Sequence, residues 1–100
     1  MTKAAPGLRA GGGFVVGSLV GMRVPDPSEV THAPYRREPY IRVVFPDGVR
    51  DGKAMAWTRD MVLFHAEPEG IVTDVWVPAH AVTRIPRQDS TWTDPYDLLR

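Results

Sequence analysis

The stretch that decides the fold is residues 74–85, DVWVPAHAVTRI. Its alternating apolar residues before Pro78 predict a β-strand, because successive side chains of a strand point to opposite faces of the sheet. Proline lacks a backbone N–H and cannot continue a paired strand, so the strand should end there. Val82 then begins a second apolar run. The stretch therefore predicts a corner, in which residues 79–81 turn the chain from one strand into a closing strand.

Other segments have the alternation or β-branched content of strands and are separated by turn residues. They are residues 14–24, 40–45, 53–57, 61–65 and 71–77. Residues 53–57 and 61–65 form either two short strands or one bent strand. Turns are predicted at Pro46-Asp47-Gly48 and at residues 67–70, because proline and glycine supply the angles that turns require. With no long helical period, the pattern predicts an all-β fold, a small barrel of five to six strands.

Three parts of the chain differ in composition. Residues 1–13 contain three consecutive glycines and are expected to be a flexible N-terminal arm. Residues 14–86 form the barrel, and within them residues 25–39 carry four of the ten prolines, which predicts a long loop. Residues 87–100 are an aromatic C-terminal tail with a short helical turn that begins at Asp94-Pro95. This tail either folds back over the barrel or docks on another chain, which includes self-association with a second copy.

The segment Val77-Pro78-Ala79-His80-Ala81-Val82 resembles the corner of SH3 domains, where a strand ends at a hydrophobic residue and a proline. In that family a one-turn 3-10 helix follows, and then a short strand that opens with valine. The resemblance covers residues 14–86 and implies an SH3-like barrel, with the long loop beside the Pro78 corner. The tyrosine of the family's corner is Ala81 here, and no ALYDY-like segment is present in residues 14–25. The resemblance therefore implies the fold without the family's binding of proline-rich ligands.

Composition restricts the classes of function. Twelve basic and twelve acidic residues give no net charge, so no global field attracts nucleic acid or an anionic membrane. The absence of cysteine excludes disulfides and thiol catalysis. No apolar run approaches the roughly 20 residues that span a bilayer, and the N-terminus lacks the apolar region of a secretory signal, so a cytoplasmic location is expected. Ten of the twelve basic residues are arginine, a bias of GC-rich genomes that suggests an actinobacterium or one of its phages.

The residues able to carry chemistry do not form a recognisable catalytic or metal motif. His32, His65 and His80 lack the spacing of metal ligands, so each is expected to be exposed or hydrogen-bonded. No serine lies in a nucleophile motif. The carboxylates of Glu67 and Asp94 stand in turns, where solvation or capping explains them. We therefore expect no enzyme activity, no metal and no cofactor.

A non-catalytic protein–protein interaction module, such as an adaptor or accessory subunit, is the function that the sequence favours. Tyrosine and arginine are favoured at binding hot spots, and both occur in the long loop. The expected partner-binding residues are Tyr35, Arg36, Arg37, Tyr40, Trp76, Pro78, Trp92, Tyr96 and Leu99. Tyr40 and Trp76 contribute only if they face outward, and core packing is the alternative for both.

Nucleic-acid binding is the second functional hypothesis. Small β-barrels bind single strands through a basic groove with interleaved aromatic side chains. The arginines that would form this groove are Arg36, Arg37, Arg42, Arg84 and Arg87.

Overall fold

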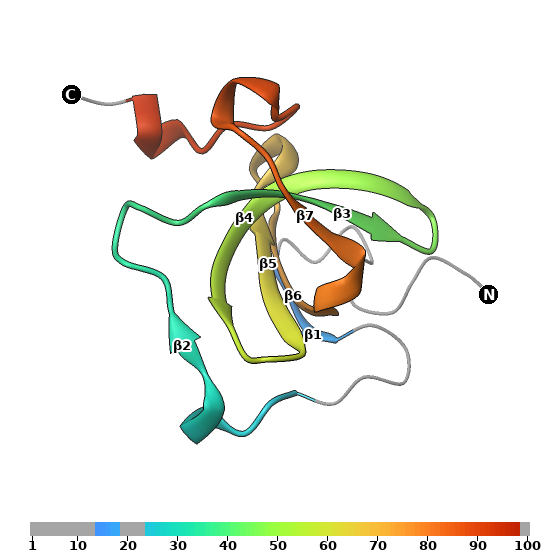
Figure 1. Ribbon diagram of the computed structural model, residues 1–100. Helices are drawn as coiled ribbons and strands as arrows, with labels where there is room; N and C mark the ends of the chain where they lie inside the picture. Colours follow the sequence, from blue (N-terminus) through green and yellow to red (C-terminus); the bar gives the residue numbers. More distant parts are fainter. Residues whose placement is uncertain (1–13, 19–23, 99–100) are drawn as a thin grey trace.

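A single curled sheet makes up the fold in the computed structural model, which describes residues 14–18 and 24–98 (Figure 1). Its strands are β1 (Phe14–Ser18), β2 (Thr31–His32), β3 (Tyr40–Phe45), β4 (Gly48–Trp57), β5 (Met61–Ala66), β6 (Val72–Pro78) and β7 (Val82–Arg84). Helical structure in the described residues is limited to short 3-10 turns. The predicted all-β class is confirmed.

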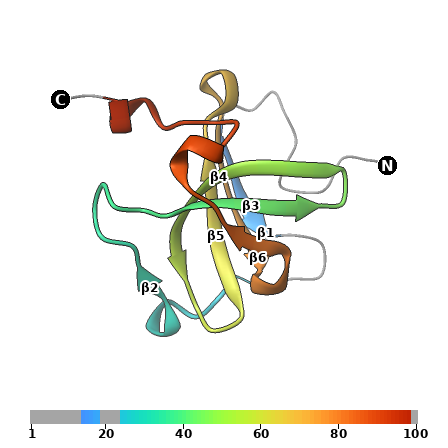
Figure 2. The ribbon, with the colours of Figure 1, turned by 45° about the horizontal axis from the view of Figure 1, so that its top comes forward.

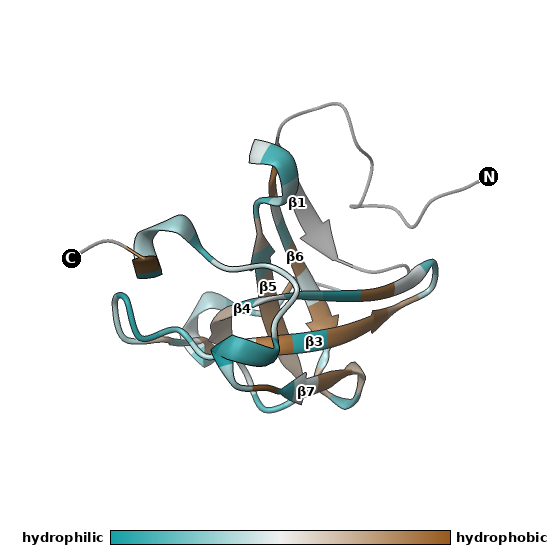
Figure 3. Ribbon diagram, turned by 90° about the horizontal axis from the view of Figure 1, so that it is seen from above, coloured by the Kyte–Doolittle hydropathy of each residue, from teal (hydrophilic) through white to brown (hydrophobic). Residues whose placement is uncertain are grey.

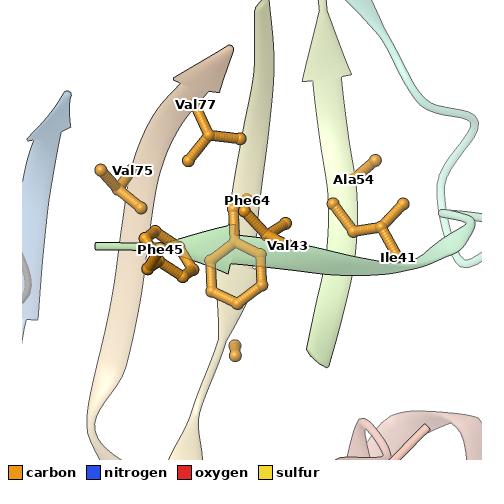
Figure 4. Packing of buried hydrophobic residues seen from close by; sticks show 8 residues of the cluster. Ile41, Val43, Phe45, Ala54, Phe64, Val75 and Val77 are labelled. Carbon is orange, nitrogen blue, oxygen red and sulfur yellow. The ribbon is translucent and has the colours of Figure 1, made fainter. Parts of the chain in front are cut away.

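Strand order is β1-β6-β5-β4-β3-β7, and the two-residue β2 pairs with β4 outside this path. The six strands of the path agree with the five to six that were predicted. Strands β3 to β6 are linked by consecutive antiparallel hairpins, and β7 returns to pair with β3. The sheet rolls over on itself, so β3 crosses in front of β5 and β6 (Figures 1 and 4).

The corner at Pro78 forms as predicted. Strand β6 ends at Pro78, residues Ala79–Ala81 make one 3-10 turn, and β7 begins at Val82. The Val82 N–H donates to the Ala79 carbonyl and closes the turn. The Ala79 N–H donates to the Asp60 carbonyl at 2.8 Å. The corner is thereby tied to the turn between β4 and β5.

The first strand and the long loop precede the hairpin-linked strands, in the order that the sequence predicted. Strand β1 is described over Phe14–Ser18, and it pairs in parallel with β6. Strand β3 is the one that pairs with both β4 and β7, so the hairpin series starts after the loop. Residues 25–39 therefore precede this series, and they contain a 3-10 turn and β2. The predicted arm at residues 1–13 and the continuation of the first strand through 19–23 lie outside the described residues.

Residues 53–57 and 61–65 belong to two separate strands, and β4 starts five residues earlier than predicted, at Gly48. The tight turn at residues 46–48 lets pairing between β3 and β4 begin at once, and Gly48 has a φ of 142°, which favours glycine. The polar residues Arg50 and Asp51, together with Gly48 and Gly52, break the apolar alternation in this first half of β4, so the sequence pattern did not predict it.

The barrel interior is built from the alternating faces that the sequence predicted (Figure 4). Ile41, Val43 and Phe45 of β3 are all buried, and Phe64 of β5 is almost fully buried among them. The rings of Phe45 and Phe64 meet edge to face with centroids 5.2 Å apart, a favourable aromatic geometry. This cluster extends to β6 through Val75.

A second, smaller apolar cluster contains Ala56, Met61 and Trp76, with Val30 packed against it. Strand pairing shifts between Ala54 and Ala56, which is a β-bulge at this point in β4. Val30 lies in the long loop, just before β2 joins β4. Trp76 is buried in this cluster, so the expectation that it lies at a binding surface is corrected.

Candidate interaction surface

The C-terminal tail folds back on the barrel, and Asp51 is its first anchor. The buried Asp51 carboxylate accepts two bonds from Arg42, at 2.8 and 3.1 Å, and two from Thr91, at 2.8 and 3.1 Å. The hydrogen bond from Arg42 lowers the pKa of Asp51, so the carboxylate stays charged. Arg42 also donates to the Asp89 carbonyl at 3.0 Å. Arg42 therefore connects β4 to the tail through its bonds to Asp51 and to the Asp89 carbonyl.

The C-terminal tail runs beside the barrel (Figures 1 and 2), and Trp92 is its partly buried hydrophobic residue that packs against the main core cluster. Trp92 also lies near Tyr40 and His65, with ring centroids 6.3 and 6.1 Å away. Of the two alternatives for the tail, folding back on its own barrel is therefore the one observed. The packing role of Trp92 corrects its assignment as a partner-binding residue.

Lys53 is the second anchor and is the most buried charged residue of the described part, with 2% of its surface exposed. Its Nζ lies 2.9 Å from Glu38, 3.1 Å from Asp94 and 3.3 Å from Asp97. Burial alone would lower the pKa of Lys53, but the hydrogen bonds to Glu38 and Asp94 outweigh it and raise the pKa. The ammonium group therefore stays charged and joins the loop before β3 to the tail.

Tyr40 is the third anchor. Its hydroxyl donates to the Asp97 carboxylate and accepts the Asp94 N–H at 2.9 Å. Burial, followed by the hydrogen bond to Asp97, raises the pKa of Tyr40 to about 12. The ring is buried, because Trp92 and the tail lie over this side of β3. Tyr40 is therefore buried beneath the tail. This corrects the expectation that Tyr40 is an exposed, partner-binding residue.

Above these anchors the long loop and the tail meet (Figure 3). The Arg36 guanidinium donates to the Tyr96 carbonyl at 2.7 Å. Tyr35, Tyr96 and Leu98 are 86%, 63% and 66% exposed. We call these four residues, Tyr35, Arg36, Tyr96 and Leu98, the loop–tail surface. A pocket of about 290 Å³ beside it is lined by both tyrosines, by Lys53 and by the three carboxylate residues that surround Lys53.

A second cavity, of about 640 Å³, adjoins the loop–tail surface. Four arginines line it: Arg36, Arg37, Arg84 and Arg87. We call it the arginine cleft. It therefore brings together four of the five arginines of the nucleic-acid hypothesis, and the fifth, Arg42, is bound to Asp51 instead.

Pro78 is separate from both cavities. Neither cavity lined by residues 35–39 includes Pro78 among its lining residues. The loop segment with Tyr35 lies beside the tail, whereas Val30 of the same loop packs against the cluster that contains Met61, the residue that pairs with Pro78. Leu99, another predicted partner-binding residue, lies outside the described residues.

His65 is hydrogen-bonded, as expected from the sequence. Its Nδ1 lies 2.5 Å from the Asp74 carboxylate and its Nε2 lies 3.1 Å from Glu67. The hydrogen bond to Asp74 is the main cause that raises the pKa of His65. Across residues 14–18 and 24–98, no cluster of three or more side chains is suited to hold a metal ion.

These contacts predict a pH dependence of stability. The pKa of His65 is raised on folding. The charged imidazole therefore adds its full contribution to the free energy of unfolding at pH values below the unfolded pKa of about 6.5. That contribution is lost as the pH rises through the folded pKa. We expect the free energy of unfolding to fall by about 1 kcal/mol more in the wild type than in His65→Gln over this range. Urea titrations between pH 6 and 9 measure it. His80→Gln, at an exposed histidine, should retain the wild-type pH dependence; equal slopes for wild type and His65→Gln would contradict the prediction.

Comparison with known proteins returns no relative: no family model, curated protein or solved structure matches the chain. In the part of the chain that the structure describes, no helix has the length and apolar character needed to cross a membrane.

Sequence reasoning missed Asp51 and Lys53 as the anchors of the tail. Lys53 precedes the apolar run Ala54–Trp57, and its flanking positions gave no indication of a buried ion pair. One signal was present. In a chain with ten arginines and two lysines, a lysine inside a predicted strand is unusual, and it fits a site where three carboxylates surround one compact ammonium group.

Proposed function

We propose that this chain is a non-catalytic protein-interaction module, an adaptor or accessory subunit, that binds a protein partner through the loop–tail surface. The observation that carries the proposal is the exposure of Tyr35 and Tyr96 beside Arg36. Tyrosine and arginine supply most of the binding energy at many interfaces. The arginine-rich composition supports, as part of this proposal, a cytoplasmic role in an actinobacterium or in a cell infected by one of its phages.

The anchoring of the surface supports the proposal. Lys53 binds Glu38 of the loop and Asp94 of the tail, and Tyr40 binds the tail. Arg36 of the loop also donates to the tail, at the Tyr96 carbonyl. Side chains carried by segments that are already ordered lose less conformational entropy on binding. A partner would therefore meet a surface that is largely preformed.

Affinity capture tests this function. The tagged wild type, expressed in an actinobacterial host, should retain a protein that the double variant Tyr35→Ala/Tyr96→Ala loses. The matched control is Val44→Ser/Val49→Ser, which changes two valines that are also about 60% exposed, on the hairpin of β3 and β4. Retention of the same protein by the wild type and both variants, or by none of them, would contradict the proposal.

Nucleic-acid binding is the second candidate, and the gathering of four arginines in the arginine cleft favours it. Exposed tyrosines nearby would offer faces on which bases stack. Fluorescence anisotropy with a labelled single-stranded oligonucleotide at low salt decides the question. An unchanged signal at micromolar protein would exclude this candidate.

A further inference from the structure

The arginine cleft has positive charge that the fold itself does not use. Arg36 donates one hydrogen bond to the Tyr96 carbonyl, and Arg87 donates one to the Asp97 carbonyl. A guanidinium has five N–H donors, so each retains free donors. Arg37 and Arg84 form no ion pair with any residue of the described part. The cleft can therefore bind anionic groups without disturbing the anchors.

The two carboxylates in the cleft leave a positive excess. Glu38 and Asp97 line the cleft, but both also lie within 3.3 Å of Lys53 Nζ. Four guanidinium groups therefore face two carboxylates that already share a buried cation. Guanidinium groups bind carboxylates through paired, charge-assisted hydrogen bonds, which give both energy and geometric selectivity.

A free strand edge leads into the cleft. Strand β7 lies at one end of the strand order, and among the described strands it pairs with β3 alone. The Ile85 N–H donates to the Tyr40 carbonyl, so in an antiparallel ladder the backbone of Arg84 faces away from β3. Extended peptides add to exposed edges of this kind through backbone hydrogen bonds. The side chain of Arg84 lines the cleft beside this edge.

We propose that the arginine cleft and the edge of β7 together bind an extended acidic segment of the partner protein, with its Asp or Glu side chains in the cleft. This inference rests on the proposed function, because it names the chemistry of the partner. The mixed charges of the cleft and the zero net charge of the chain favour an acidic peptide over nucleic acid, whose binding depends on a large positive excess. The free edge of β7 adds a contact that suits a peptide backbone.

Fluorescence anisotropy with a labelled ten-residue peptide of alternating glutamate and valine tests the inference. The wild type should bind it, and Arg37→Glu and Arg84→Glu should each weaken binding by about tenfold. The matched control is Arg59→Glu, which makes the same charge change at an exposed position in the turn between β4 and β5. It should change the affinity by less than about twofold, and a peptide with glutamine in place of glutamate should not bind. Circular dichroism checks that every variant is folded.

Each of the other outcomes overturns the inference. Equal loss with Arg59→Glu would indicate non-specific attraction, and equal binding of the glutamine peptide would remove the role of charge. Binding of a ten-nucleotide thymidine strand in place of the peptide would assign the cleft to nucleic acid. Binding of neither probe would leave the cleft without a ligand.

The proposed function and this inference can fail separately. A partner captured through Tyr35 and Tyr96, and retained by Arg37→Glu/Arg84→Glu, would support the function and overturn the acidic segment. Peptide binding that depends on Arg37 and Arg84, in a chain that captures no partner through its tyrosines, would do the reverse.

Discussion

Replacement of Lys53 by alanine is expected to lower the free energy of unfolding by about 3 kcal/mol, because it leaves buried carboxylates without their cation. Glu38, Asp94 and Asp97 all lie within 3.3 Å of Lys53 Nζ, and each of their side chains is at most 13% exposed. Carboxylates removed from water and facing one another repel strongly. Urea unfolding followed by tryptophan fluorescence measures the loss.

Two controls identify the cause of this loss. Lys53→Met keeps most of the side-chain volume, so it should lose nearly as much stability as Lys53→Ala if charge is responsible. The loss should also shrink as the pH falls toward 4, because the uncompensated carboxylates can then take up protons. A loss below about 0.5 kcal/mol, or one that methionine restores, would show that Lys53 acts through packing.

A second large effect is expected for Gly52→Ala, with a loss of about 3 kcal/mol. Gly52 is buried in β4, and a Cβ built there would lie 2.4 Å from the His65 carbonyl oxygen and 2.6 Å from the Phe64 ring. Neither neighbour can yield easily, since one is backbone of the paired strand and the other is the centre of the core. Strands β4 and β5 would have to separate. Thermal and urea unfolding give the measurement.

Gly70→Ala is the matched comparison for this prediction. Gly70 has a φ of 81°, but a Cβ there would meet nothing within 4 Å. Its substitution should cost only the strain of a left-handed alanine, about 1 kcal/mol. Equal losses at positions 52 and 70 would contradict the close packing between Gly52 and Phe64.

The parts of the fold that follow local rules were predictable. The alternation in residues 40–45 and 71–77 predicted strands with two distinct faces, and the structure buries one face of each: Ile41, Val43 and Phe45 in β3, and Val75 and Val77 in β6. The fixed φ and missing donor of Pro78 predicted the corner. In each case the signal and the structure that it specifies lie within a few residues of each other.

The candidate site was only partly predictable, because it depends on contacts between residues that are distant in the sequence. Tyr35, Arg36 and Tyr96 are exposed, but periodicity could not show that loop and tail meet. Tyr40 and Trp76 are buried by segments outside their own strands. Lys53 is separated from Asp97 by 44 positions, so its ion pairs leave no local pattern.

The tail illustrates this difference best. Its helical turn was predicted from Asp94 and Pro95, and the Tyr96 N–H does donate to the Asp94 carboxylate at 2.9 Å. Whether the tail covers its own barrel was left open, since apolar residues outside a core do not specify what covers them. The hydrogen bonds from Thr91 to the buried Asp51 fix the tail on its own barrel.

The central claim is that the tail is part of the fold and, together with the long loop, forms the loop–tail surface. The melting temperature of the chain lacking residues 88–100 tests it most directly. Deletion removes Trp92 and so exposes the part of the core cluster that it packs against. It also removes two of the carboxylates that surround Lys53, and it removes Thr91, which donates to Asp51. We expect the melting temperature to fall by about 15 °C, which corresponds to about 3 kcal/mol in a domain of this size. A melting temperature within about 2 °C of the wild-type value would contradict the account.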